Sequence, residues 1–141
     1  MKKLKTDQQL KEAERKKCVA LAKEISKTRD KYTCQFCGRK KPDVAIHSHH
    51  IYNEGCHQSM SADTDNLITV CFTHHSSSWN AKDPSFHKNP MEMADWFTNK
   101  FPALHQKLRE RSRKTEKCDL FYWKKKRILL KDELDQLSNN K

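Results

Sequence analysis

The fold depends first on the stretch Cys34-Gln-Phe-Cys37-Gly38, which places two thiols three positions apart on a tight turn. Two thiolates at this spacing can reach one ion, and a glycine relieves the strain of such a turn. Tetrahedral zinc needs two further ligands, and Cys71-Phe-Thr-His74 offers them at the same spacing. We therefore predict a structural Zn²⁺ site that joins two segments distant in sequence. Its ligands are Cys34, Cys37, Cys71 and His74.

Two other zinc assignments are open at this point, and spacing disfavours both. Cys56 and His57 could supply ligands in place of the second pair. A Cys₂His₂ finger has the required twelve residues between Cys37 and His50, but six residues then separate His50 from His57. Fingers need a gap of about three to five residues at that point and a continuous recognition helix, which residues 53–55 (Asn-Glu-Gly) interrupt.

The charge of the chain indicates a polyanionic partner. Its 141 residues carry 29 Lys and Arg against 18 Asp and Glu, a formal net charge of +11. Nucleic acid is the natural partner of such a chain, although basicity alone is equally a way to keep a protein in solution. With 35% apolar and 33% charged residues the core must be modest, so we expect one compact domain with appended helices.

Hydropathy and cysteine content bear on the compartment. No apolar run approaches the roughly 20 residues that cross a bilayer, and the N-terminal stretch lacks the apolar core of a signal peptide. We therefore expect a cytoplasmic protein with no membrane partner. In a reducing compartment the six cysteines favour metal binding over a disulfide framework.

The first part of the chain predicts a helix and the middle part a hairpin. Residues 7–28 contain no Gly or Pro and have apolar side chains at helical spacing, so we predict a basic amphipathic helix with Cys18 in the core. Apolar runs at 44–46 and 67–72 have strand length, and the loop between them, 53–65, is rich in turn formers. The cations of the helix expected to face outward are Lys16, Lys17, Lys23, Lys27 and Arg29.

Further helices are predicted towards the C-terminus. Asn89-Pro90 is typical of a cap followed by a first-turn proline, and Pro102 opens another helix to about Lys114. Asp119 caps a last helix whose apolar residues fall on a heptad seam. The seam consists of Leu120, Trp123, Leu130, Leu134 and Leu137. If exposed, it would allow a homodimer through the C-terminal helix.

Together these elements predict an α+β fold in three regions. A basic N-terminal helix occupies residues 1–30, a zinc-stabilised core residues 31–88, and a C-terminal helical region residues 89–141.

A histidine cluster lies between the two halves of the predicted zinc site, in residues 46–52 (IHSHHIY). Successive side chains of a strand face opposite sides, so His49 and His50 cannot both fill a core unless each finds a polar partner. A functional site explains them better. Just past the second predicted strand, His75 follows the predicted zinc ligand His74 directly, on what should be the first turn of a helix.

Four motifs follow one another in order: Cys-x-x-Cys, His-His-Ile, Asp-Asn-Leu (residues 65–67) and Cys-x-x-His-His. This order resembles the HNH (ββα-metal) endonucleases with a built-in zinc site, as found among phage recombination and junction-resolving nucleases. The resemblance covers about residues 32–80, and a phage subgroup extends it to Trp96. It implies a ββα-metal core with a zinc knuckle, flanked by basic helices.

The resemblance also implies a role for each matching residue. His50 matches the general base, His49 and His75 match the ligands of the catalytic metal, and Asn66 matches the asparagine that braces the loop holding the base. Two positions depart from the family pattern: His49 is more often Asp, and His74 replaces a fourth cysteine. Imidazole ligands suit Mn²⁺ or another transition ion better than Mg²⁺, although Mg²⁺ with several waters stays open.

The implied function is a metal-dependent DNA endonuclease that leaves 5′-phosphate and 3′-hydroxyl ends with weak sequence preference, encoded by a phage and acting in the host cytoplasm. A neutral histidine can deprotonate water, and a divalent cation can stabilise the leaving oxygen. A non-catalytic zinc-dependent nucleic-acid-binding module and a structural adaptor are the alternatives. Outside the main cluster, His47 is expected to be a spare ligand or to support the site, and His57 and His87 to be merely exposed.

Overall fold

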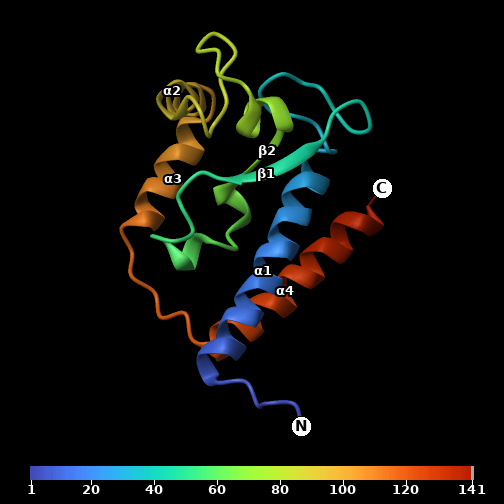
Figure 1. Cartoon of the computed structure of the whole chain (residues 1–141), viewed down its shortest axis with the longest axis vertical. Helices are drawn as coiled ribbons and strands as arrows, with labels where there is room; N and C mark the ends of the chain where they lie inside the picture. The colour runs from blue at the N-terminus through green and yellow to red at the C-terminus, as the bar shows by residue number, and fades with distance from the viewer. Residues whose placement is uncertain (141) are drawn as a thin grey trace.

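The computed structural model describes residues 1–140 and has an α+β architecture, with a small antiparallel sheet among helices (Figure 1). The α-helices are α1 (Asp7–Arg29), α2 (Pro90–Lys100), α3 (Pro102–Ser112) and α4 (Leu120–Asn139). The strands are β1 (Ile46–His50) and β2 (Leu67–Cys71), and short turns are η1 (Gln58–Met60), η2 (Thr64–Asn66) and η3 (Thr73–Ser77). The predicted α+β class is confirmed.

The hairpin is placed by hydrogen bonds to the end of α1. β1 and β2 pair antiparallel, with His49 opposite Ile68 and His50 opposite Leu67. The Ser26 hydroxyl lies 3.0 Å from the Thr69 hydroxyl, which donates to the Ser26 carbonyl at 3.1 Å. Two strands alone are marginally stable in water, so this docking is what holds the sheet.

One hydrophobic core lies between α1 and α4, which run side by side in Figure 1. Cys18 and Trp123 are fully buried there, as predicted for Cys18. Leu130 is buried, and Leu134 and Leu137 pack against the same core. The heptad seam is therefore used within the chain, and the premise of the expected homodimer, an exposed seam, is wrong.

A second core lies beneath the sheet and is covered by α2 and α3. Ile68 and Val70 of β2 pack there with Phe97 of α2 and Leu108 of α3. The predicted zinc ligands Cys34 and Cys71 belong to the same cluster, so the candidate metal site is part of this core.

Several expectations need correction. The first strand begins at Ile46 and runs through the histidines, beyond the predicted 44–46. The long connection contains the 3₁₀ turns η1 and η2, and the helix expected after β2 is a single π-helical turn, η3. Lys23 and Lys27 are half-buried, whereas the other three cations of their predicted face are exposed.

The helix predictions otherwise match. α1 spans the expected residues, proline opens both α2 and α3, and the Asp119 side chain caps α4 by accepting from the backbone N–H of Tyr122 at 2.8 Å. The predicted C-terminal region ends at Lys141, which lies outside the described residues. Among the described helices, none is both long and apolar enough to cross a bilayer.

Candidate metal centre and active site

The predicted zinc ligands converge on one point. Every pair of ligand atoms in the set Cys34, Cys37, Cys71 and His74 lies within 4.8 Å. Cys34 and Cys37 come from a turn closed by a hydrogen bond from the Gly38 N–H to the Cys34 carbonyl at 2.9 Å. Gly38 has φ +79°, which explains the glycine of the predicted knuckle.

The spacing of these atoms fits a tetrahedral zinc ion. A regular tetrahedron with Zn–S bonds of about 2.3 Å has S···S edges of about 3.8 Å. The Cys37 and Cys71 sulfurs are 3.8 Å apart. His74 Nδ1 lies 3.2 Å from the Cys71 sulfur and 3.8 Å from the Cys34 sulfur. The residues therefore suit a structural Zn²⁺ ion.

The surroundings of the Cys₃His cluster shift the pKa values of its thiols. Burial raises the pKa of the Cys34 thiol to about 11. Burial also acts to raise the pKa of Cys37, but hydrogen bonds from Arg39 outweigh it and lower that pKa to about 6. Cys37 is therefore a thiolate at neutral pH, and a bound ion would favour deprotonation of the buried Cys34 thiol.

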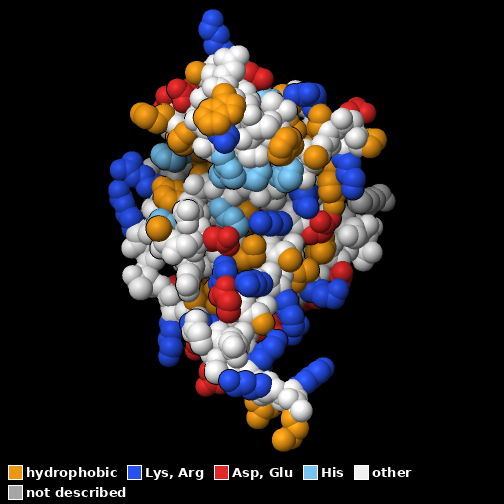
Figure 2. All heavy atoms as spheres, in the orientation of Figure 1, with side chains coloured by type: hydrophobic (Ala, Val, Ile, Leu, Met, Phe, Trp, Pro, Cys, Tyr) orange, Lys and Arg blue, Asp and Glu red, His pale blue; other side chains and the backbone are white. Residues whose placement is uncertain are grey.

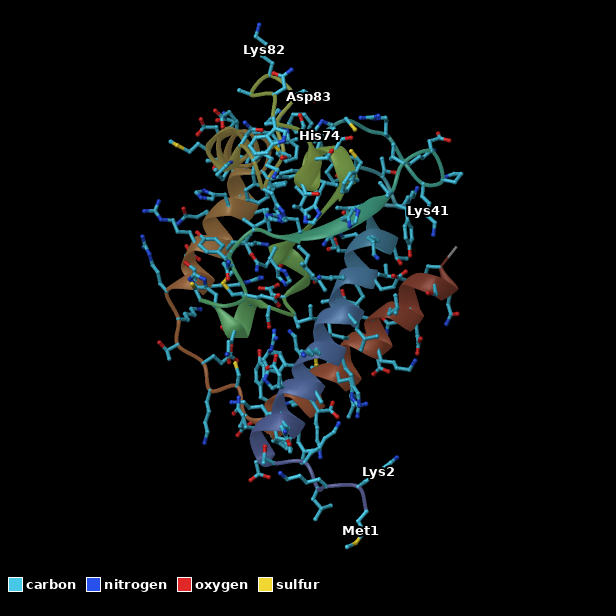
Figure 3. All side chains as sticks on the ribbon, in the orientation of Figure 1. Met1, Lys2, Lys41, His74, Lys82 and Asp83 are labelled. Carbon is cyan, nitrogen blue, oxygen red and sulfur yellow. The ribbon has the colours of Figure 1, made fainter. Side chains whose placement is uncertain are left out.

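A carboxylate fixes the orientation of the histidine ligand. His74 Nε2 donates to Asp83 Oδ1 at 2.6 Å, and His74 itself is fully buried. Figure 3 labels both residues, with Asp83 in the loop that folds over His74. With its Nε2 occupied in this way, His74 presents Nδ1 to the thiols, an arrangement common around metal-bound histidines.

A second cluster consists of three histidines. Ligand nitrogens of His49, His75 and His87 all lie within 4.8 Å of one another. The rings of His75 and His87 are 4.5 Å apart between centroids, and His49 stacks on Phe86 at 4.2 Å. His49 and His75 were predicted to meet, and the structure brings them together. His47 stacks on His75 at 5.0 Å, at the edge of the group.

His87 is the third member of the cluster, although the sequence predicts only an exposed side chain there. The loop carrying His87 returns alongside η3, where the N–H of Phe86 donates to the His74 carbonyl at 2.9 Å and the N–H of His87 to the His75 carbonyl at 3.1 Å. His87 remains exposed, but its ring closes the cluster. The only signal for His87 in the sequence is one more histidine after the Cys-x-x-His-His motif.

Both inner histidines are held neutral. Burial, with a smaller contribution from His75, lowers the pKa of His49 to about 3. Burial, with a smaller contribution from His87, lowers the pKa of His75 to about 4. The positive charge of Lys23 on α1 acts in the same direction on both. Neutral imidazoles keep a lone pair for a cation at neutral pH.

His50 lies apart from this cluster. Its Nε2 donates to the Ser61 carbonyl at 2.7 Å and lies 3.9 Å from a carboxylate oxygen of Glu54. Glu54 in turn accepts from Arg15 of α1 at 3.1 Å. The three cluster histidines therefore meet on one side of β1, while His50 contacts the loop and α1 side.

Asn66 ties the loop that holds His50. Asn66 is fully buried, its Oδ1 accepts from the N–H of Tyr52 at 2.8 Å, and its Nδ2 donates to the carbonyls of Tyr52 and Met60 at 3.0 Å each. Met60 directly precedes Ser61, whose carbonyl holds His50. The side chain therefore fixes both ends of the connection around that histidine.

The histidines gather on one face of the molecule. Figure 2 shows them as a band across the upper part of the surface, with Lys and Arg side chains on either side and below. A surface of this kind can hold a phosphate next to a cation.

Comparison with known protein families, with characterised proteins and with solved structures returned no match for this chain.

Proposed function

We propose that this protein is a metal-dependent DNA endonuclease of the HNH kind, with a ββα-metal core built on β1, β2 and η3. The observation that carries the proposal is the convergence of His49, His75 and His87 beside a Cys₃His cluster. A structural zinc site alone would not need three further imidazoles next to it, two of which, His49 and His75, burial holds neutral. The order of motifs in the sequence supports the same class.

In this proposal His50 is the general base. Because its Nε2–H is held by the Ser61 carbonyl, the lone pair of the neutral ring is on Nδ1. A neutral imidazole with a free lone pair can take a proton from water. Asn66 acts as a positioning residue, since it holds the backbone on both sides of the contact.

The three cluster histidines hold the catalytic cation in this proposal. A divalent cation bound there would stabilise the charge on the scissile phosphate and the leaving oxygen. All three ligands are nitrogens, which favours Mn²⁺, Co²⁺, Ni²⁺ or Zn²⁺ over Mg²⁺. Lys23 adds a positive charge near the cluster, and the net charge of +11 favours sequence-independent contacts with the DNA backbone.

A plasmid-nicking assay with a panel of divalent cations tests the proposal. We expect nicking that a chelator abolishes and that His50→Ala reduces by about a hundredfold or more, the usual size of a general-base contribution. DNA affinity should survive this change. His57→Ala is the matched control, because it removes a histidine outside both clusters. Nicks that DNA ligase reseals would identify the 5′-phosphate and 3′-hydroxyl ends.

Metal binding is tested separately by calorimetric titration of Co²⁺ into the zinc-loaded protein. His87→Ala should weaken this binding by more than tenfold while leaving the zinc content unchanged. If the wild-type chain binds DNA but cuts none with any cation, the nuclease proposal is wrong. The non-catalytic nucleic-acid-binding module would then be the better description.

A further inference from the structure

A cavity of about 280 Å³ lies beside the histidine cluster, between the end of β1 and helices α2 and α3. His49 and Phe86 form one wall, with their rings stacked at 4.2 Å. His49 also belongs to the cluster of three histidines. The cavity and the candidate metal centre therefore share a wall, so a group in the cavity would lie directly next to a phosphate at the cluster.

The rest of the lining consists of flat rings and apolar groups. Tyr52 follows β1, Phe97 comes from α2, and His105 from α3. The rings of Phe97 and His105 meet edge to face at 6.5 Å. At about 30 Å³ per water, the cavity has the volume of about nine water molecules, slightly below the range of drug-sized pockets. This size and lining suit one flat, neutral ring system.

The charge of the surroundings narrows the choice of ligand. The chain carries a net charge of +11, and the positive charge of Lys23 contributes to the lowered pKa of His49, which lines the cavity. A ligand that fits must combine a flat neutral ring with a phosphate one sugar away. A nucleotide unit of a DNA strand has this combination.

We propose that this cavity binds one unpaired nucleobase next to the scissile phosphate, so that the substrates are DNAs with an unstacked base. This inference rests on the proposed function and names its substrate class: single strands, gaps, flaps and junctions in preference to intact duplex. A base inside a duplex is paired and stacked on both sides, and moving it into a pocket opposes both interactions. An unpaired base is already free to stack on aromatic side chains.

The test uses substitutions at the rim that fill the cavity with a larger side chain, and it detects binding of the base by fluorescence. Ala94 and Thr98 line the cavity on α2, and both are exposed, so Ala94→Phe or Thr98→Phe adds a ring without removing a core side chain. Ala103→Phe on α3 is the matched control, since Ala103 is an exposed helical alanine outside the lining. All variants also carry His50→Ala so that the DNA remains intact, and thermal unfolding checks that they fold.

The probe is a duplex with a short gap that contains the fluorescent base 2-aminopurine. Binding should change its emission for the parent chain and for Ala103→Phe, and Ala94→Phe or Thr98→Phe should lose this change. These two variants should bind gapped DNA about tenfold more weakly, the size of one lost base stack. Their affinity for intact duplex should remain within about twofold.

The result that overturns the inference is an emission change that survives in Ala94→Phe and Thr98→Phe, or one that Ala103→Phe loses equally. No emission change with the parent chain would overturn it as well. Because the readout is binding of a base and needs no cleavage, it stays separate from the nicking assay. Active nicking with no base signal would reject the cavity and keep the nuclease, and a base signal without nicking would reject the nuclease.

Discussion

Replacing Asn66 by alanine should destabilise the protein by about 3 kcal/mol, because it removes three hydrogen bonds at once. The Met60 carbonyl is buried and would keep only the longer bond from the Asp63 N–H at 3.3 Å, so the lost hydrogen bond costs about 1–1.5 kcal/mol. The N–H and carbonyl of Tyr52 are partly buried, so water can replace the amide there, and we assign about 0.5–1 kcal/mol to each. A small domain has about 5–15 kcal/mol in total, so the loss is easily measured.

Urea unfolding followed by circular dichroism measures this change. Asn99→Ala is the control, because Asn99 is exposed on α2 and should change the free energy of unfolding by less than about 0.5 kcal/mol. Hydrogen exchange at the Tyr52 amide should become faster in Asn66→Ala only. A loss below about 1 kcal/mol together with unchanged exchange at Tyr52 would refute the reasoning that Asn66 braces this loop.

Asn66→Asp should make the free energy of unfolding depend on pH. It keeps an acceptor for the Tyr52 N–H but turns an oxygen towards two carbonyls. The buried carboxyl should therefore have a pKa above its unfolded value of about 3.9. A raised folded-state pKa of an acid favours folding only while the carboxyl is protonated, so the stability of the variant relative to the parent chain should be highest below about pH 4 and should fall as the pH rises through the folded-state pKa.

Two further predictions concern the metal and the DNA. Removal of zinc by a strong chelator should abolish the cooperative thermal transition, because structural zinc contributes about 10–16 kcal/mol, as much as the whole stability of a small domain. An unchanged transition after one equivalent of zinc has been released would contradict the assignment of Cys34, Cys37, Cys71 and His74. Lys23→Met should weaken DNA binding, because one phosphate contact is lost. The slope of log affinity against log salt concentration, measured by fluorescence anisotropy, should decrease in magnitude by about 1. An unchanged slope would place Lys23 outside the DNA interface.

The Cys₃His cluster could be predicted from the sequence because each of its two pairs is local. Two side chains three positions apart on one turn can reach the same point with little dependence on the rest of the chain. The helices were predictable for a similar reason, since capping by Asp119 and the first-turn prolines act within one turn. The burial of Trp123 and Leu130 against α1 could not be predicted in this way. The heptad pattern is equally compatible with packing against a partner chain and with packing against another helix of the same chain.

The third member of the histidine cluster could not be predicted, because His87 is placed by the return of a loop. Twelve positions separate it from His75, and backbone hydrogen bonds to η3 together with the bond between His74 and Asp83 bring the loop back. The helix expected after β2 also fails locally: Ser76, Ser77 and Ser78 are poor helix formers, and the chain turns away after one π-helical turn. Lys23 was placed outward by its position on the amphipathic stripe, but the sheet end packs against that part of α1 and half buries it.

The Cys₃His cluster and the histidine cluster are connected through this same loop, and Asp83 tests the connection. His74 and His75 are adjacent, so one turn supplies a side chain to each cluster, and the loop that carries Asp83 also carries His87. Asp83→Ala should weaken zinc binding by about 10–100-fold, the usual effect of losing a carboxylate on a metal-bound histidine. It should also weaken Co²⁺ binding at the histidine cluster, because His74 and His75 hold the backbone of Phe86 and His87.

Chelator competition gives the zinc affinity, and Lys82→Ala is the control, since Lys82 lies at the exposed tip of the same loop (Figure 3). Asp83→Asn keeps an acceptor for the His74 Nε2–H and should therefore show a smaller effect than Asp83→Ala. If Asp83→Ala reduces zinc affinity but leaves Co²⁺ binding equal to that of Lys82→Ala, the clusters are independent. Loss of both affinities in Asp83→Ala alone would mean that the structural ion sets the geometry of the second cluster, because the loop has no other carboxylate anchored on His74.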